Sequence, residues 1–246
     1  MDCGTWYENA GTCRDEIMRS AISEACRLWF GITMTSTLLL LGIIMNIVSL
    51  FETCGLLSQL RRHDLAVSIA AVVFRGFLLI NPQIRIKQFD VDWDQLAASA
   101  PAMILMNHSS YFDFFLFTAM LPPFVIRRAH VRTVISAALT RLPMVGKCVG
   151  EHAGSFSVFF QAKGAGFGKG DASDFSVDRE RQQTETERME AHIEKMGGTI
   201  ALCPEGGMNK TPSEGLNPFR RGSFAQVRQI LIRYSAIPQT VADYVV

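Results

Sequence analysis

Residues 102–121, AMILMNHSSYFDFFLFTAML, contain the clearest strand-to-helix transition in the chain. The first five residues are apolar without a break, which is typical of a fully buried strand. From residue 111 onward the sequence is apolar enough for a buried helix, and Pro122 and Pro123 end it. His108 therefore falls at a sharp turn after a strand, where α/β proteins commonly place their functional sites.

Strand and helix patterns also alternate on both sides of this unit. Residues 83–89, QIRIKQF, alternate apolar and polar side chains as a half-buried strand does, and a polar connector over 90–101 follows. Further strands are predicted over residues 175–177, 199–203 and 236–241, and helices over 180–196 and 224–233. We therefore expect an α/β fold with a mixed central sheet flanked by helices.

The apolar residues of the chain are concentrated near its amino terminus. Residues 28–51, LWFGITMTSTLLLLGIIMNIVSLF, carry no charge and one amide, Asn46. As a helix they would span about 36 Å, which exceeds a bilayer core of ~30 Å. We predict a transmembrane helix, since the remaining chain is too small to bury every face of such a segment. An acidic stretch precedes it, so we expect a retained anchor and not a cleaved signal peptide.

A second apolar segment covers residues 65–80, LAVSIAAVVFRGFLLI, and contains Arg75. An Arg within an isolated span costs at least ~2.5 kcal/mol, so an interfacial helix or a hairpin returning to the same side is expected. The predicted organisation is an N-terminal segment over residues 1–27, a membrane anchor over 28–82 and a domain over 83–246. The orientation in the membrane stays open.

Charge and cysteine spacing exclude several classes of protein. The formal net charge is +1, which disfavours a nucleic-acid partner. The six cysteines show no Cys-x-x-Cys spacing and the five histidines are scattered, so neither a metal site nor a redox pair is predicted. Glycines are frequent over residues 153–171, which predicts a loop or insertion. Arg127, Arg128, His130 and Arg132 are expected to contact lipid headgroups or to form ordinary surface.

His108 and Asp113 form the most chemically specific pair. A neutral imidazole takes a proton from an alcohol, and a carboxylate on its other nitrogen fixes the tautomer. This arrangement is the base and orienting half of a hydrolase triad, but no Gly-x-Ser-x-Gly nucleophile elbow occurs. The attacking hydroxyl is therefore expected to belong to the substrate.

The segment NHSSYFD, residues 107–113, resembles the His-x4-Asp motif of the glycerolipid acyltransferases, the 1-acylglycerol-3-phosphate acyltransferase family. Later segments agree in order with that family's other blocks. FSVDR at 175–179 resembles Phe-x-x-Asp-Arg, and CPEGG at 203–207 resembles the start of Phe-Pro-Glu-Gly-Thr-Arg. PFRRGSF at 218–224 resembles Pro-Phe-Lys-Lys-Gly-Ala-Phe, and AIP at 236–238 takes the place of the last block.

The resemblance implies a membrane-bound acyltransferase with its catalytic domain over residues 83–246. His108 and Asp113 would be the general-base pair and Arg179 would bind the substrate phosphate. Glu205, Gly206, Gly207 and Lys210 would line the substrate site. The implied donor is acyl-CoA, or acyl carrier protein in bacteria, with no metal or prosthetic group. The implied acceptor is lysophosphatidate, which would become phosphatidate in the endoplasmic reticulum membrane of a eukaryote or the inner membrane of a bacterium.

The sequence departs from the family pattern in three places. Gly207 and Met208 stand where the family has Thr-Arg, and Lys210 is the expected substitute. The interval from His108 to Arg179 is long. Only eight residues follow Pro238, and this predicts a shortened sheet or a partial gene product. A lysophospholipid or glycerol-3-phosphate acyltransferase, or a non-catalytic lipid-binding relative, therefore stays open as an alternative.

Overall fold

A parallel sheet of four described strands forms the centre of the molecule. The computed structural model describes residues 4–86, 91–110, 112–142, 145–160, 177–209, 211 and 215–217, with side chains from residue 20 onward. The strands are β1 (Met103–Leu105), β2 (Arg132–Ser136), β3 (Phe156–Val158) and β4 (Ile200–Leu202), in the order β1-β4-β2-β3. Because every pairing is parallel, the strands all end at one edge of the sheet, the carboxyl edge, and begin at the other, the amino edge.

Helices cover both faces of this sheet. They are α1 (Gly4–Thr53), α2 (Gln59–Leu79), α3 (Trp93–Ala98), α4 (Asp113–Met120), α5 (Pro123–Ala129) and α6 (Arg179–Met196), with short helices η1 (Leu139–Arg141) and η2 (Lys147–His152). Successive side chains of β4 (Ile200–Leu202) pack on opposite faces of the sheet, so this strand contributes to the cores on both faces. Ala201 packs in a core with residues of α2 to α5, whereas Ile200 and Leu202 pack with Met189 and Ile193 of α6. The result is a layered α/β fold, as expected from the sequence.

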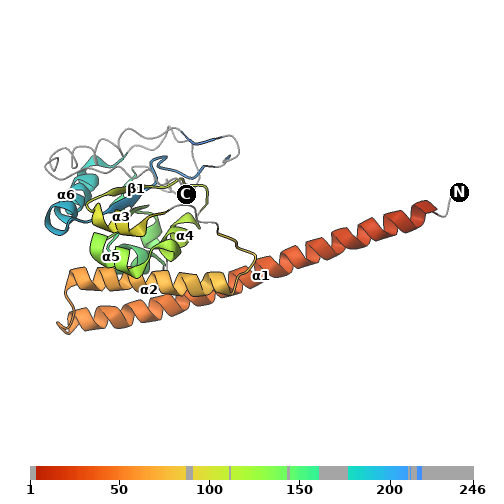
Figure 1. Cartoon of the computed structure of the whole chain (residues 1–246), viewed down its shortest axis with the longest axis horizontal. Helices are drawn as coiled ribbons and strands as arrows, with labels where there is room; N and C mark the ends of the chain where they lie inside the picture. The colour runs from red at the N-terminus through yellow and green to blue at the C-terminus, as the bar shows by residue number, and fades with distance from the viewer. Residues whose placement is uncertain are drawn as a thin grey trace.

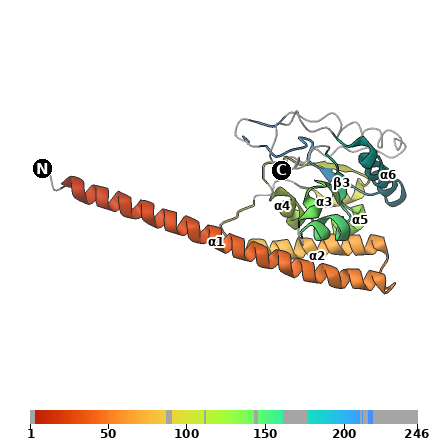
Figure 2. The same ribbon diagram turned by 180° about the vertical axis from the view of Figure 1, so that it is seen from behind.

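The two amino-terminal helices form a hairpin along one side of the α/β layers, and α1 continues far beyond them (Figures 1 and 2). Within the described chain, α1 contains one stretch, Ser20–Thr53, that is long and apolar enough to cross a membrane. One face of this stretch is buried, at Leu41, Met45 and Val48. Large apolar side chains on its other face are exposed. The outward face is therefore apolar with no protein neighbour among the described residues.

Several polar residues of helix α2 contact the α/β layers. The guanidinium of Arg75 donates from Nε to the carbonyl of Ala119 and from Nη2 to that of Leu121, both at 2.7 Å. These carbonyls lie at the end of α4, where a helix leaves acceptors unsatisfied and favours positive charge. Helix α2 packs along α1, and Arg75 holds α4. Whether this segment lies in the membrane interface or forms a hairpin returning to the same side of a membrane stays a prediction. The boundary between anchor and domain at residue 83 stays a prediction.

Several predicted elements are present and others were wrong. The strand at residue 102, the helix after it, the helix near 180 and the strand near 200 appear as β1, α4, α6 and β4. Residue 83 belongs to a turn, and residues 84–86 are irregular and form no strand. The connector over 90–101 contains α3, which begins because the Asp92 carboxylate accepts from the amide of Gln95 at 2.8 Å.

The predicted glycine-rich loop contains β3, whose alternation Phe156-Ser157-Val158 precedes the glycines. No prediction was made for α5 and β2. Arg132 was expected at the surface, which was wrong, because its side chain is only 2% exposed and paired with Asp64. Outside the described residues lie 87–89, 161–176, Lys210, the segment 218–224, the helix expected at 224–233 and the strand and block expected at 236–241.

Candidate active site

The turn after β1 holds His108 against Asp113 at the start of α4. The distance from His108 Nδ1 to Asp113 Oδ2 is 3.3 Å, and the two side chains are 28% and 22% exposed. A carboxylate only accepts, so Nδ1 donates this hydrogen bond, and in the neutral form of the ring Nε2 carries the lone pair. No hydrogen bond to Nε2 occurs within the described part of the chain, which leaves this nitrogen available to a ligand.

The same carboxylate oxygen also organises the turn. It accepts hydrogen bonds from the backbone amides of Ser109 at 2.7 Å and Ser110 at 2.8 Å. Burial acts to raise the pKa of Asp113, but the hydrogen bonds from His108, Ser110 and Ser109 outweigh it and hold the pKa below its usual 3.8. Asp113 therefore stays ionised at neutral pH, as an orienting carboxylate must.

The turn after β4 meets the His108 turn at the carboxyl edge of the sheet. Glu205 is 2% exposed, and its Oε1 accepts from the backbone amide of His108 at 3.2 Å. Its Oε2 accepts from the amide of Asn217 at 3.2 Å. Glu205 thus holds the backbone that carries the histidine. A direct contact between Glu205 and a substrate stays a prediction.

Glycines after Glu205 give this turn its shape. Gly206 has a φ of 65°, in the left-handed region that favours glycine, and its amide donates to the carbonyl of Cys203 at 3.0 Å. A side chain added at Gly207 would meet nothing within 4 Å, so open space lies beside it. Lys210, the expected second cation, lies outside the described residues.

Asn209 and Phe112 belong to the site, and sequence analysis missed both. The amide of Asn209 donates to the carbonyl of His108, and its buried side chain donates to Gly215 and accepts from Thr211. The Phe112 ring packs against Phe30 of α1 and Phe77 of α2, each with centroids 5.7 Å apart. Phe112 precedes Asp113 in a visibly aromatic run, whereas a lone Asn gives no sequence signal.

Arg179 lies at the carboxyl edge but apart from the other predicted residues. It is the exposed first residue of α6, which Asp178 caps by accepting from the amide of Arg181 at 3.3 Å. The amide of Asp178 in turn donates to Phe159, just after β3. Since β3 and β1 are three strand spacings apart, Arg179 stands about 14 Å across the sheet from the His108 turn. No contact joins Arg179 to His108, Asp113 or Glu205 in the described structure.

Cys203 lies beside the pair but is no nucleophile. Burial raises the pKa of its thiol to about 12, and the charges of Asp113 and Glu205 act in the same direction. The thiolate, which is the reactive form, is therefore suppressed at neutral pH. In the described residues no group of three or more His, Cys, Asp or Glu side chains is arranged to hold a metal ion.

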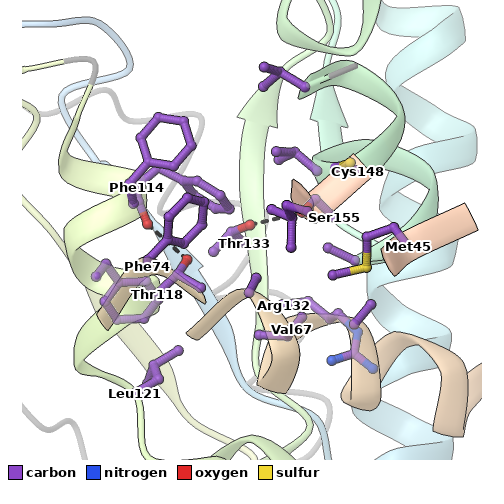
Figure 3. Close-up of a pocket in the computed structure, with 18 of the residues that line it drawn as sticks. Met45, Val67, Phe74, Phe114, Thr118, Leu121, Arg132, Thr133, Cys148 and Ser155 are labelled. Carbon is purple, nitrogen blue, oxygen red and sulfur yellow. Dashed lines mark hydrogen bonds between the residues drawn. The ribbon is translucent and has the colours of Figure 1, made fainter. Parts of the chain in front are cut away.

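An apolar cavity lies between the helical hairpin and the sheet (Figure 3). Phe114, the neighbour of Asp113, lines it together with Phe74, Leu121 and Met45. Its polar contributors are largely satisfied by one another, since Thr118 donates to the Phe114 carbonyl and Thr133 bonds Ser155. The open volume is only about 30 Å³, so a long apolar ligand enters only if the lining side chains move.

A family model described as Acyltransferase matches residues 88–242, which is well over half of the chain. A search of curated proteins found no match. The matched region begins close to the predicted boundary at residue 83 and includes His108, Asp113, Arg179 and Glu205.

Proposed function

This chain belongs to the acyltransferase family, and on that premise we propose that it moves a fatty acyl group from acyl-CoA to the free hydroxyl of lysophosphatidate, forming phosphatidate. The observation that carries the proposal is the His108 and Asp113 pair at the carboxyl edge, with Nε2 open. A histidine in this state is competent as a general base. The donor needs no metal activation because a thioester is already reactive.

The proposed reaction follows from the geometry of the pair. Nε2 of His108 takes the proton from the acceptor hydroxyl while that oxygen bonds to the thioester carbonyl carbon. The tetrahedral intermediate then collapses, the bond from carbon to sulfur breaks, and the leaving CoA thiolate takes the proton from the imidazolium. Asp113 stabilises the imidazolium, a contribution of the kind worth about 10²- to 10⁴-fold together with the base. The backbone amide of Gly207, which lies beside open space, is suited to donate to the oxyanion.

The apolar cavity supports a long-chain acyl donor. Phe114, which lines it, directly follows Asp113 in the chain, and the acyl chain of the donor is proposed to occupy this cavity. Its lining of Phe, Leu and Met side chains is apolar and adaptable. Which chain lengths it accepts depends on how far those side chains move.

We further propose that α1 attaches the enzyme to a membrane as an integral protein. Its outward face is apolar, and Phe30 of the same helix packs on Phe112 beside the active site. A lipid acceptor would then reach His108 from the bilayer. The expected location is the endoplasmic reticulum membrane in a eukaryote or the inner membrane in a bacterium. Retention in the pellet after carbonate extraction supports integral attachment, and release into the supernatant contradicts it.

Acyl transfer from labelled acyl-CoA to lysophosphatidate by membranes containing the full chain tests the activity. His108→Gln is the main variant because it keeps size and polarity while removing the base. We expect wild-type membranes to form labelled phosphatidate and the variant to form at least about 100-fold less. Equal product from both would refute the catalytic role and favour a non-catalytic lipid-binding protein. Lysophosphatidylcholine and glycerol 3-phosphate, assayed alongside, test the acceptor.

Arg179 is proposed to bind the acceptor phosphate, because it is an exposed cation at the same edge of the sheet as His108. Arg179→Ala is expected to raise KM for lysophosphatidate with a smaller change in kcat. Arg181→Ala is the matched control, since Arg181 is also exposed and lies one half-turn further along α6. If both variants have the same KM as wild type, the phosphate contact lies elsewhere.

A further inference from the structure

A second, polar cavity lies away from the active site, at the amino edge of the sheet. It has a volume of about 520 Å³ and is bounded by the start of α2, by η2, by β3 and by α6. Three cations line it, Arg62, Lys147 and Arg188, and Glu151 is the one carboxylate among the lining residues that are described. A roomy cavity with this balance is suited to an anion.

Arg62 is the buried part of this cavity. Its side chain is 7% exposed and forms an ion pair from Nη1 to Glu52 at 2.8 Å. Nη2 lies 3.0 Å from His63 Nε2 and 3.3 Å from the carbonyl of Glu151. The remaining donor, Nε, is buried without a hydrogen-bond partner in the described structure. Buried donors are nearly always paired, and this Nε, although itself inaccessible, belongs to a guanidinium whose residue lines the cavity.

His63 adds a neutral donor. A guanidinium only donates, so Nε2 of His63 accepts from Arg62 and its proton is on Nδ1. Burial, with the charges of Arg132 and Arg62, lowers the pKa of His63 to about 3, which keeps the ring neutral at pH 7. Gly154 packs against this ring, and a Cβ added there would lie 2.5 Å from Nδ1. The cavity wall therefore depends on glycine at this position.

Lys147 and Arg188 complete the positive lining. Arg188 forms an ion pair with Glu185 at 2.6 Å. Neither Glu185 nor Glu52, the partner of Arg62, lines the cavity itself. Lys147 is exposed and has no ion pair in the part of the chain that the structure describes. Its ammonium is therefore accessible from solvent, and Glu151 is the one carboxylate that shares the described lining with it.

The cavity is separate from the His108 site. Arg62 lies near the start of α2, whereas Phe77, which contacts Phe112 beside the active site, lies near its end. The 15 residues between them correspond to about 22 Å along the helix. The hairpin turn that joins α1 to α2 borders the cavity and exposes Phe51 and Leu56, so a membrane surface can lie close by.

We propose that this cavity binds a phosphate group, carried either by a phospholipid headgroup or by a small soluble anion. Arg62 and Lys147 supply charge and His63 supplies a neutral N–H. The binding does not depend on acyl transfer, because none of these residues contacts His108 or Asp113.

The test uses the purified full chain with two probes. Flotation with phosphatidylcholine vesicles, with and without phosphatidylinositol 4-phosphate, measures headgroup binding, and the shift of the melting temperature with inorganic phosphate measures soluble-anion binding. Lys147→Ala is the main variant and Lys195→Ala, an exposed cation on α6 outside the cavity, is the control. All proteins carry Arg179→Ala, so that binding at the proposed acceptor site does not contribute.

We expect Lys147→Ala to weaken binding of one probe about fivefold, the effect of removing one cation near an anionic surface, and Lys195→Ala to leave it unchanged. If Lys147→Ala weakens only the binding to vesicles, the ligand is a lipid headgroup. If it weakens the binding of inorganic phosphate, the ligand is a soluble anion. Arg188→Ala is expected to weaken binding of the same probe. If Lys147→Ala and Arg188→Ala bind both probes as the control does, the proposal is refuted.

Discussion

In the described chain, two histidine and aspartate pairs share one type of contact. His108 and Asp113 lie at the carboxyl edge of the sheet, with Nδ1 and Oδ2 3.3 Å apart. His130 and Asp64 lie at the amino edge, where the same two atom types are 2.8 Å apart. By distance alone the second pair is the better hydrogen bond.

The surroundings of the two aspartates differ. Asp64 also receives Arg132 Nη2 on its other oxygen at 2.6 Å, and that guanidinium is almost fully buried. Asp113 receives backbone amides and no cation in the described structure. The charge of Asp64 is thus committed to a buried ion pair that joins α2 to β2, whereas Asp113 serves the histidine and its turn. A short contact does not identify a catalytic pair, and its place at the carboxyl edge is more informative.

The largest expected effect is a loss of kcat, and it should follow substitution of Asp113 and not of Asp64. Asp113→Asn should lower kcat at least about 100-fold with little loss of stability, because an amide oxygen still accepts from the turn amides but no longer fixes the tautomer of His108. Initial rates of acyl transfer and a melting curve measure the two quantities. Wild-type kcat in this variant would remove Asp113 from the mechanism.

Asp64→Asn, in the second pair, should instead lower the stability of the fold. It leaves Arg132 buried without a charged partner, so the free energy of unfolding should fall by about 3–5 kcal/mol. Chemical denaturation measures this loss, and the folded fraction should keep its kcat. A loss below about 1 kcal/mol would show that the ion pair does not hold α2 to the sheet.

A smaller effect on stability and on kcat is expected from substitution of two buried carboxylates, Glu205 and Glu185. Glu205 accepts from the amide of His108, and Glu185 accepts from the amide of Ser157 at 2.9 Å. Either substitution to Ala leaves a backbone donor unpaired, which costs about 1–3 kcal/mol of unfolding free energy. Only Glu205→Ala should also lower kcat, as measured on samples matched for folded protein. Equal kcat in both variants would contradict a positioning role for Glu205.

The smallest expected effect is a difference in acid sensitivity. Burial, with the charge of Arg132, lowers the pKa of His192 to about 4, and its Nε2 lies 2.8 Å from the carbonyl of His130. The unfolded chain binds a proton near pH 6.5 that the folded chain excludes, so His192 lowers stability as pH falls from 6.5 to 4. Asp113, with a lowered pKa, loses its contribution only below pH 3.8.

His192→Gln should therefore reduce the slope of the denaturation midpoint against pH between pH 6.5 and 4, and His63, whose pKa is lowered to about 3, contributes to the slope that remains. Gln keeps a donor for the carbonyl of His130 but does not titrate. Denaturant titrations at several pH values measure the slope, and Asp113→Asn serves as the control that should leave this window unchanged. An unaltered slope in His192→Gln would place the acid-sensitive group elsewhere.

Sequence alone predicted those elements whose pattern is local. The apolar run before His108 and the one-sided helix ending at Met196 were found because burial repeats with the period of the element. Helix α3 was missed because its signal is a single cap at Asp92 in a polar segment. Strand β3 was missed because adjacent glycines dominated the composition of its surroundings.

The site was predicted to a similar extent. His108 and Asp113 are five residues apart, so one turn brings them together and the motif is visible in the sequence. Asn209 and the His130 and Asp64 pair were not predicted, since their partners are distant in the chain. Arg132 was placed at the surface because a run of basic residues gives no sign of the aspartate 68 residues away that buries it.

The sequence by itself determined the α/β layers, the apolar amino-terminal helix and the chemistry of the His108 turn. These features depend on side-chain periodicity and on neighbours within a few residues. Only the tertiary structure decided which charges are buried, and how Arg75 holds α2 to α4 while Asp64 holds α2 to β2. Those outcomes depend on contacts between segments far apart in sequence, and side-chain patterns within one segment do not encode them.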